Sequence, residues 1–335
     1  MVLPSIKTQL VDVSSKVEGP CRFLYKLELD QPSGSFKLRG MSKLIADSIE
    51  KAKAEGQKPH IFSSSGGNAG LASAYASKHH NVPCTVVLPV TSQQISIDKL
   101  KNYGANVVIH GAHWGEANSY LRDTVIGGAP KDVHPVYCHP FDNPVLWDGH
   151  GEMVDEIAEQ LGEHNIEVSK VKGIVLSIGG GGLFNGVIEG LKRNKGLNNV
   201  PVMAIETYQT PAFGEALKAG RVVTLSKLDT IVNCLAAPSV SQTSLENSRT
   251  YPSFGKQIDD LEALAGTVDY YDKVGGLVEP ACGVTVVAST RRQDLLEVFG
   301  ELKSDDVIIF IICGGSGVSE DTIAQYRELL ATKSH

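Results

Sequence analysis

The chain has 335 residues, of which 42% are hydrophobic and 21% charged, as in an ordinary globular protein with a sizeable core. Its net charge of -7, with no basic block, argues against a nucleic-acid partner. The N-terminus does not resemble a signal peptide, no apolar run is long enough to cross a membrane, and the six cysteines are scattered without a C-x-x-C pair. We therefore expect a cytoplasmic protein without disulfides, structural zinc or membrane contact.

Short apolar segments alternate with helical segments along the chain. In chain order, the predicted strands are 22–29, 60–64, 84–89, 105–111, 173–178, 201–208 and 307–313. The predicted helices are 41–54, 67–80, 92–104, 114–126, 143–163, 183–193, 212–220 and 319–333. This alternation is typical of α/β proteins, in which parallel sheets are covered by helices on both faces.

The alternation covers more strands than one open sheet usually has, so we predict two three-layer α/β domains. The smaller domain is placed at residues 40–142, and the larger at residues 1–39 and 143–335. Ligands of such folds bind at the carboxyl ends of the strands, where loops lead into helices. Four unusual stretches occupy such positions.

The first stretch is PSGSFKLRG, residues 32–40, in which small turn-forming residues precede Lys37. It is either a plain turn with a solvated lysine or a confined amine that acts as nucleophile or base. The second is SSSGGNAG, residues 63–70, between a strand and a helix. Its serines either cap the helix or, with Asn68 and exposed backbone N–H groups, hold a carboxylate.

The third stretch, SIGGGGL, contains Gly179, Gly180, Gly181 and Gly182 before Leu183. Consecutive glycines suggest a close approach of the main chain to a ligand, and a phosphate is the usual occupant at a helix N-terminus. The fourth, IICGGSG, contains Cys313, either a buried core cysteine or a weak donor to a ring nitrogen. A phosphate, a carbonyl that condenses with lysine and a carboxylate-bearing partner together match pyridoxal phosphate with an amino acid.

Five motifs carry a family resemblance: QPSGSFKLRG, SSSGGNAG, GGGGLFNG, VEPACG and CGGSG, in this order from about Phe23 to Gly317. They resemble the serine/threonine dehydratases, pyridoxal-phosphate enzymes with the tryptophan-synthase-β type of fold. A cysteine at the position of Cys313 resembles the eukaryotic L-serine dehydratase branch of this family. The segment YCHPFDNPVLWDGHG, residues 137–151, resembles fungal catabolic serine/threonine dehydratases.

The resemblance implies that Lys37 binds the cofactor covalently and then acts as general base, while Phe36 packs on the ring. Cys313 is expected at the ring nitrogen and Asn68 at the ring hydroxyl, with the cofactor in the cleft between the domains. The implied phosphate ligands are Gly179, Gly180, Gly181, Gly182 and Leu183. The implied carboxylate ligands of the substrate are Ser64, Ser65, Gly66, Gly67, Asn68 and Ala69. L-Serine and L-threonine would lose water, and the products would then be hydrolysed to 2-oxo acids and ammonia; the enzyme would be a homodimer.

Two other functions remain open at this point. An NAD-dependent oxidoreductase would use Gly180, Gly182 and Gly186, with Glu206 as the acid that binds the ribose. A related pyridoxal-phosphate serine racemase is the other alternative. In the resembled family Glu206 instead belongs to a monovalent-cation (K⁺) site, although the residue of one further ligand is replaced here by Ala212. The histidines have no partner pattern, so they are expected to be structural.

Overall fold

A computed structural model describes residues 1–333 as two compact units. Residues 1–6 and 31–149 form the smaller unit, and residues 7–30 join the chain from His150 onward in the larger unit. The boundaries expected from the sequence, 40 and 142, lie inside the smaller unit. The turn that contains Lys37 therefore belongs to the smaller unit.

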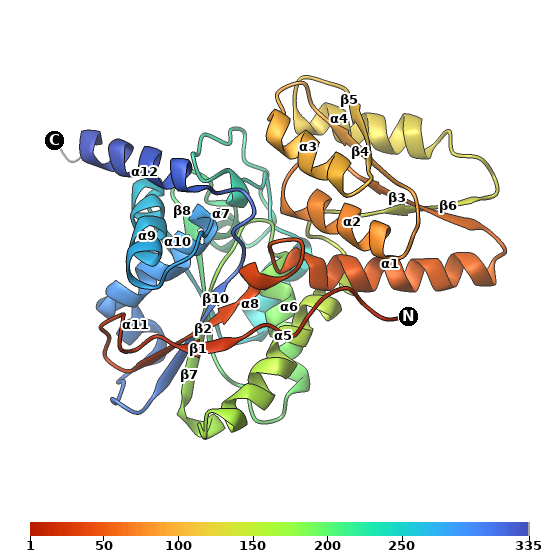
Figure 1. Ribbon diagram of the computed structural model, residues 1–335. Coiled ribbons are helices and arrows are strands. Elements are labelled where there is room, and N and C mark those ends of the chain that lie inside the picture. The colour runs from red at the N-terminus through yellow and green to blue at the C-terminus, as the bar shows by residue number, and fades with distance from the viewer. Residues whose placement is uncertain (334–335) are drawn as a thin grey trace. The chain divides into compact units, whose positions relative to one another are not determined.

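The smaller unit contains a four-stranded parallel sheet in the order β5-β4-β3-β6 (Figure 1). Its strands are β3 (Lys58–Ser63), β4 (Cys84–Leu88), β5 (Asn106–Ile109) and β6 (Val133–Tyr137). Its helices are α1 (Lys37–Ala54), α2 (Asn68–His79), α3 (Gln94–Asn102) and α4 (Trp114–Tyr120), which continues as the π-helix η2 (Leu121–Ile126).

Helices cover both faces of this sheet because successive strand residues point to opposite sides. Ile61 packs in a core cluster with apolar residues of α1, α2 and α3. The next residue, Phe62, packs with Ala117 of α4 and Leu121 of η2 on the other face. The predicted three-layer arrangement is therefore present in this unit.

The larger unit contains a six-stranded sheet in the order β1-β2-β10-β7-β8-β9. Its strands are β1 (Leu10–Asp12), β2 (Arg22–Leu27), β7 (Val171–Ser177), β8 (Val202–Thr207), β9 (Ser253–Ile258) and β10 (Val307–Ile312). Every residue of β10, with the sequence VIIFII, is buried, as its apolar character predicts. The strands β2 and β7 pair with β10 on either side. All neighbours are parallel except β1, an antiparallel edge strand that the sequence did not indicate.

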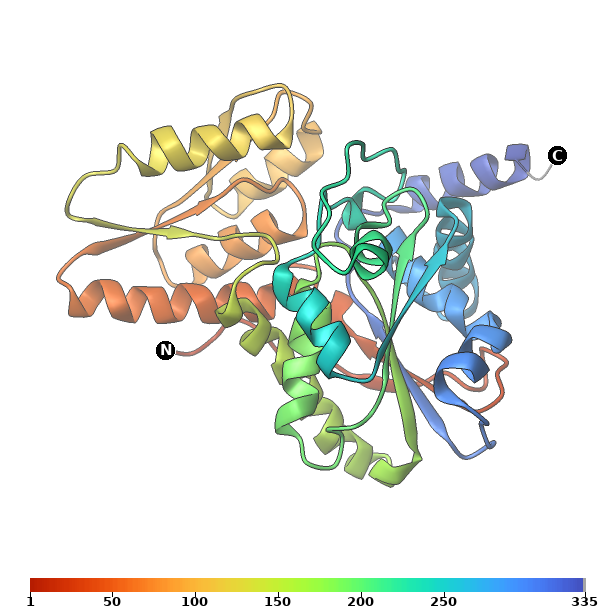
Figure 2. The same ribbon diagram turned by 180° about the vertical axis from the view of Figure 1, so that it is seen from behind.

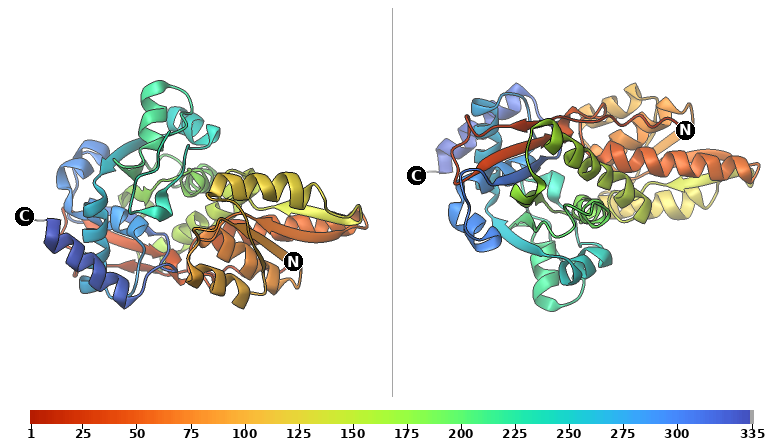
Figure 3. Two further views of the ribbon diagram at one scale, coloured as in Figure 1. Left: turned by 90° about the horizontal axis from the view of Figure 1, so that it is seen from above. Right: turned by 90° about the horizontal axis from the view of Figure 1, so that it is seen from below.

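Helices lie on both sides of this second sheet, with α5, α6 and α8 on one side and α9 and α10 on the other (Figures 2 and 3). The helices are α5 (Pro144–Glu163), which begins in the smaller unit, α6 (Gly182–Arg193), α7 (Ala212–Ala219), α8 (Gln242–Thr250), α9 (Asp260–Lys273), α10 (Pro280–Val287), α11 (Arg292–Phe299) and α12 (Glu320–Lys333). Short 3-10 turns are η1 (Glu28–Asp30), η3 (Val168–Lys170), η4 (Asn233–Leu235) and η5 (Ala288–Thr290).

One boundary difference matters for the site. The helix expected from residue 41 begins at Lys37, because the buried Gly40 is tolerated inside its first turns despite a low helix propensity. Lys37 thus lies where the turn ends, as the first residue of α1. Within residues 1–333, no helix is long and apolar enough to cross a membrane.

Candidate active site

Lys37 lies at the end of the turn that the sequence singled out. Gly34 has a φ of 84° and donates its N–H to the carbonyl oxygen of Gln31 at 2.6 Å, so the chain reverses just before α1. The amine of Lys37 donates to the carbonyl oxygen of Pro140, after β6, and lies 5.1 Å from the ring centre of Phe36. A half-buried amine held by a carbonyl is not the solvated lysine of the plain-turn interpretation.

His139 adds a neutral imidazole to this environment. Its Nδ1 accepts the backbone N–H of Asp142 at 2.8 Å and that of Phe141 at 3.3 Å, so the neutral ring carries its proton on Nε2. Burial, helped by the positive charges of Lys37 and Arg122, lowers the pKa of His139 to about 4. The sequence analysis gave His139 no role, and its place in the dehydratase-like segment was the one available signal.

Two serines of the lysine turn carry buried hydroxyl groups. Ser33 is 3% exposed and Ser35 is 0% exposed, and within the described chain neither hydroxyl has a hydrogen-bond partner. A buried hydroxyl without a partner is costly unless water or a bound polar molecule satisfies it. An ordered water molecule or a bound polar group could satisfy these two hydroxyls.

The serine-glycine loop joins β3 to α2. The hydroxyl oxygen of Ser63 accepts the N–H of Ser65 at 3.3 Å, and the hydroxyl oxygen of Ser65 accepts the N–H of Gly67 at 3.3 Å. A Cβ atom on Gly70 would lie 1.8 Å from the carbonyl oxygen of Ser65, so the loop packs directly on α2. Gly67 is the N-cap of α2 and has no side chain, so the first-turn N–H groups can face a bound carboxylate.

The predicted carboxylate ligands fall on this loop and on the first turn of α2. They are Ser64, Ser65, Gly66, Gly67, Asn68 and Ala69. Ser64 is 1% exposed, and its hydroxyl donates to Oδ1 of Asn118, on α4, at 2.8 Å. Sequence reasoning did not identify Asn118.

The glycine loop of the larger unit joins β7 to α6. Gly181 has a φ of 95° and is the N-cap of α6. A Cβ atom on Gly181 would lie 1.9 Å from Oγ of Ser244, and one on Gly179 would lie 2.8 Å from the carbonyl oxygen of Leu235. At these two positions the protein itself requires glycine, whether or not a phosphate is bound. The predicted phosphate ligands occupy this connection and the first turn of α6: Gly179, Gly180, Gly181, Gly182 and Leu183.

Cys313 follows β10 and is 5% exposed. Its Sγ lies 3.4 Å from Sγ of Cys282, in the VEPACG motif on α10, and 3.8 Å from Oγ of Ser177 at the end of β7. Burial and the neighbouring Cys313 thiol raise the pKa of Cys282 well above its usual value. The two motifs therefore meet as neighbouring thiols, of which Cys282 remains protonated.

The side chain of Glu206 is buried inside the larger unit. Oε2 accepts the N–H of Phe213 at 2.8 Å, and Oε1 accepts the N–H of Gly214 at 2.7 Å and Nε2 of Gln257 at 2.8 Å. These bonds satisfy the start of α7. Burial raises the pKa of Glu206 although the three donors act in the opposite direction. Among residues 1–333, no group of three or more His, Cys, Asp or Glu side chains could hold a metal ion.

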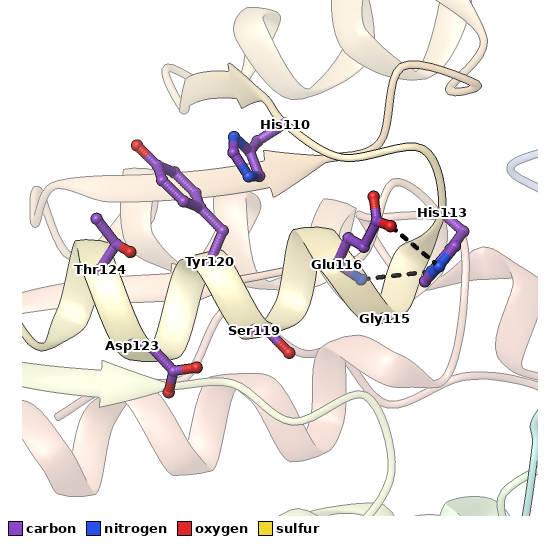
Figure 4. A pocket seen from close by; sticks show the side chains of 8 residues that line it. All are labelled: His110, His113, Gly115, Glu116, Ser119, Tyr120, Asp123 and Thr124. Carbon is purple, nitrogen blue, oxygen red and sulfur yellow. Dashed lines mark hydrogen bonds and ion pairs between the residues drawn. The ribbon is translucent and has the colours of Figure 1, made fainter.

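A hollow of about 560 Å³ lies elsewhere in the smaller unit, along α4 (Figure 4). The ring of His110 stacks on that of Tyr120 with centroids 3.8 Å apart, and Nδ1 of His113 accepts the N–H of Glu116. The lining side chains are mostly exposed, and none belongs to a residue that the sequence assigned to the site. These contacts agree with a structural role for both histidines.

Each unit thus collects its own motifs at the carboxyl ends of its strands. In the smaller unit these are the serine-glycine loop after β3 and the segment after β6 that contacts Lys37. In the larger unit they are the glycine loop after β7 and Cys313 after β10. Loops of this kind at the ends of parallel strands define a cofactor-dependent α/β enzyme.

The chain belongs to the family described as "Pyridoxal-phosphate dependent enzyme", whose sequence description matches residues 3–314. Over 97% of its length it is 38% identical to the catabolic L-serine/threonine dehydratase of Saccharomyces cerevisiae, of which 90% is covered. It is also 38% identical, over 97% of its length, to the L-serine dehydratase/L-threonine deaminase of Mus musculus, of which 94% is covered.

A similar solved structure is that of a fungal L-serine ammonia-lyase from Rhizomucor miehei, with a TM-score of 0.85 and 26% identity. The match covers 97% of this chain and 98% of that one. The predicted fold and family are therefore confirmed, and the cofactor is pyridoxal phosphate rather than a nicotinamide dinucleotide.

The residues present fit this cofactor. Lys37 supplies a half-buried amine, and the unmatched hydroxyls of Ser33 and Ser35 lie in the same turn. The start of α6 supplies backbone N–H groups suited to a phosphate. The side chain of Cys313 is a weak hydrogen-bonding partner of the kind expected beside a ring nitrogen.

Proposed function

We propose that this protein catalyses the pyridoxal-phosphate-dependent dehydration and deamination of L-serine and L-threonine, which yields pyruvate or 2-oxobutanoate and ammonia. The observation that carries the proposal is 38% identity with two dehydratases across 97% of the chain, with Lys37 in its confined turn. Amino-acid catabolism in the cytoplasm, by a homodimer, is the setting that goes with this proposal.

We propose that the cofactor is bound by Lys37 and by the glycine loop of residues 179–183. Lys37 would hold the cofactor covalently, Phe36 would pack against its ring, and Asn68 would hydrogen-bond to its hydroxyl. The N–H groups of residues 179–183 would bind the phosphate, and Cys313 would be the partner of the ring nitrogen. When bound, pyridoxal phosphate supplies an electron sink for the negative charge left on the substrate Cα.

Once the substrate amine has replaced Lys37 on the cofactor, the released amine of Lys37 would be free to accept the Cα proton of the substrate. The neutral ring of His139 places no second positive charge beside this amine. The serine-glycine loop holds the carboxylate, which fixes the direction of the Cα–H bond. The Cα–H and Cβ–OH bonds break and a Cα=Cβ double bond forms, so that the proton taken up by Lys37 and the departing hydroxide together make up the water that is lost. The released enamine tautomerises to an imine, which water hydrolyses to the 2-oxo acid and ammonia.

We also propose that Glu206, together with nearby carbonyl oxygens, binds a monovalent cation such as K⁺. The support is a buried carboxylate whose pKa burial raises, because a bound cation would stabilise its charged form. Activity measured in K⁺ and in a large organic cation tests this role. Equal activity in both would contradict it.

The function is tested with the purified protein, reconstituted with pyridoxal phosphate, and the L- and D-forms of serine and threonine. We expect ammonia and 2-oxo acids from the L-forms, and a loss of at least about a thousandfold in Lys37→Ala. Lys51→Ala, on the last turn of α1, is the matched control and should behave as wild type. Borohydride reduction should label residues 32–40. Formation of a racemised amino acid without ammonia would overturn the proposal.

A further inference from the structure

Asn118 joins two hydroxyl groups that come from different strands of the smaller unit. Oδ1 of Asn118 accepts the hydroxyl of Ser64, just after β3, at 2.8 Å, and the hydroxyl of Tyr137, the last residue of β6, at 2.7 Å. An amide oxygen has two lone pairs, and here both are used. Asn118 therefore connects α4 to the ends of two neighbouring strands.

The direction of the protons follows from this arrangement. A serine hydroxyl has one proton, and that of Ser64 is directed to Asn118. Burial raises the pKa of Tyr137, although the Ser64 hydroxyl, the charge of Arg122 and Asn118 act in the opposite direction, so its hydroxyl keeps its proton and donates it to Asn118. The guanidinium of Arg122, on η2, lies over the ring of Tyr137, 5.7 Å from its centre.

Ser65 has the opposite arrangement. Its oxygen accepts the N–H of Gly67, so its proton remains to be donated to a ligand. Two adjacent serines thus have different roles, although the sequence cannot distinguish them. Ser64 cannot donate to a carboxylate without releasing Asn118.

We propose that Asn118 is a positioning residue for substrate binding, which anchors the serine-glycine loop through Ser64 and leaves Ser65 and the N–H groups of α2 to bind the carboxylate. This inference rests on the proposed function for the identity of the ligand. The role itself depends only on contacts within the smaller unit.

The experiment compares Asn118→Ala, which removes the acceptor, with Asn118→Asp, which retains an oxygen for both hydroxyls. Ser119→Ala, at the adjacent exposed position, is the control. In the apo-protein we expect faster amide hydrogen exchange in residues 62–72 for Asn118→Ala alone. In the reconstituted enzyme, Asn118→Ala should raise KM for L-serine by about tenfold and change kcat by less than about threefold.

A double variant separates positioning from a general loss of stability. If Asn118 acts through Ser64, then Asn118→Ala combined with Ser64→Ala should raise KM no more than the larger single change. Additive increases would overturn the proposal, as would unchanged exchange and KM in Asn118→Ala. Equal loss of exchange protection in Asn118→Ala and Asn118→Asp would also overturn it, because the hydroxyls would then not donate to Oδ1.

The two proposals can fail separately. A wild-type protein that releases no ammonia from L-serine would refute the proposed function. The hydrogen-exchange comparison would still decide whether Asn118 anchors the loop.

Discussion

Replacing Gly181 with alanine should destabilise the protein before any cofactor is bound. Gly181 has a φ of 95°, a conformation that costs an alanine about 1–2 kcal/mol. The new Cβ atom would also lie 1.9 Å from Oγ of Ser244, which must move by more than an ångström. The shifts that accommodate such overpacking typically cost about 1–3 kcal/mol. The sum is a loss of about 2–5 kcal/mol in the free energy of unfolding.

The two parts of this cost can be separated in a background without the Ser244 hydroxyl. Ser244→Ala alone loses a hydrogen bond of 2.8 Å to Oγ of Ser241, which is worth about 1 kcal/mol. In the double variant the steric cost largely disappears, and about 1–2 kcal/mol from the backbone remains. The two substitutions should therefore show a favourable coupling of about 1–3 kcal/mol.

The assay is urea unfolding of the apo-protein, followed by circular dichroism. Gly162→Ala is the control, because Gly162 lies in α5 with nothing within 4 Å of an added Cβ atom. That change should stabilise the protein by about 0.5–1 kcal/mol through helix propensity. Wild-type stability for Gly181→Ala, or zero coupling with Ser244→Ala, would refute the reasoning. Reduced cofactor affinity in a residue-181 variant would not by itself demonstrate a phosphate contact.

Two further predictions concern the polar groups of the site. Cys313→Ser should keep activity within about threefold, since a serine hydroxyl is neutral. Cys313→Asp buries a carboxylate beside Cys282, so it should lower the free energy of unfolding in urea by about 3 kcal/mol. It should also shift the products away from pyruvate. An unaltered product ratio in a folded Cys313→Asp enzyme would reduce Cys313 to a core residue. Histidine NMR of the apo-protein should find the pKa of His139 near 4, and Lys37→Met should raise it but keep it below 6.5, because burial is the larger cause. As the pH falls, the unfolded chain protonates His139 before the folded chain does. The contribution of His139 to the free energy of unfolding should therefore be fully present above pH 6.5, decrease between pH 6.5 and about pH 4, and stay constant below that. His139→Asn should remove this part of the pH dependence.

Local sequence patterns were sufficient for the fold class. The strand-helix alternation predicted the parallel sheets because periodicity and burial are properties of each segment by itself. The apolar run at residues 307–313 is the central strand β10, as expected. The helix that starts at Lys37 was predicted to begin only at residue 41, since Gly40 has a low propensity that tertiary packing overrides. The antiparallel β1 is only three residues long, too short to show a period.

The motifs likewise indicated the candidate ligands, because the lysine, serine and glycine residues that the chemistry needs lie within recognisable local sequence motifs. They did not show why each residue is there. The glycines at 179 and 181 are required by Leu235 and Ser244, and Ser64 is tied to Asn118, 54 positions away. A hydrogen bond has a donor, an acceptor and a direction, and only the folded chain brings such distant partners together. The sequence by itself therefore determined the family and the fold class and pointed to the candidate reactive groups, while only the tertiary structure showed that Ser64 donates to Asn118 and that Ser65 accepts from Gly67.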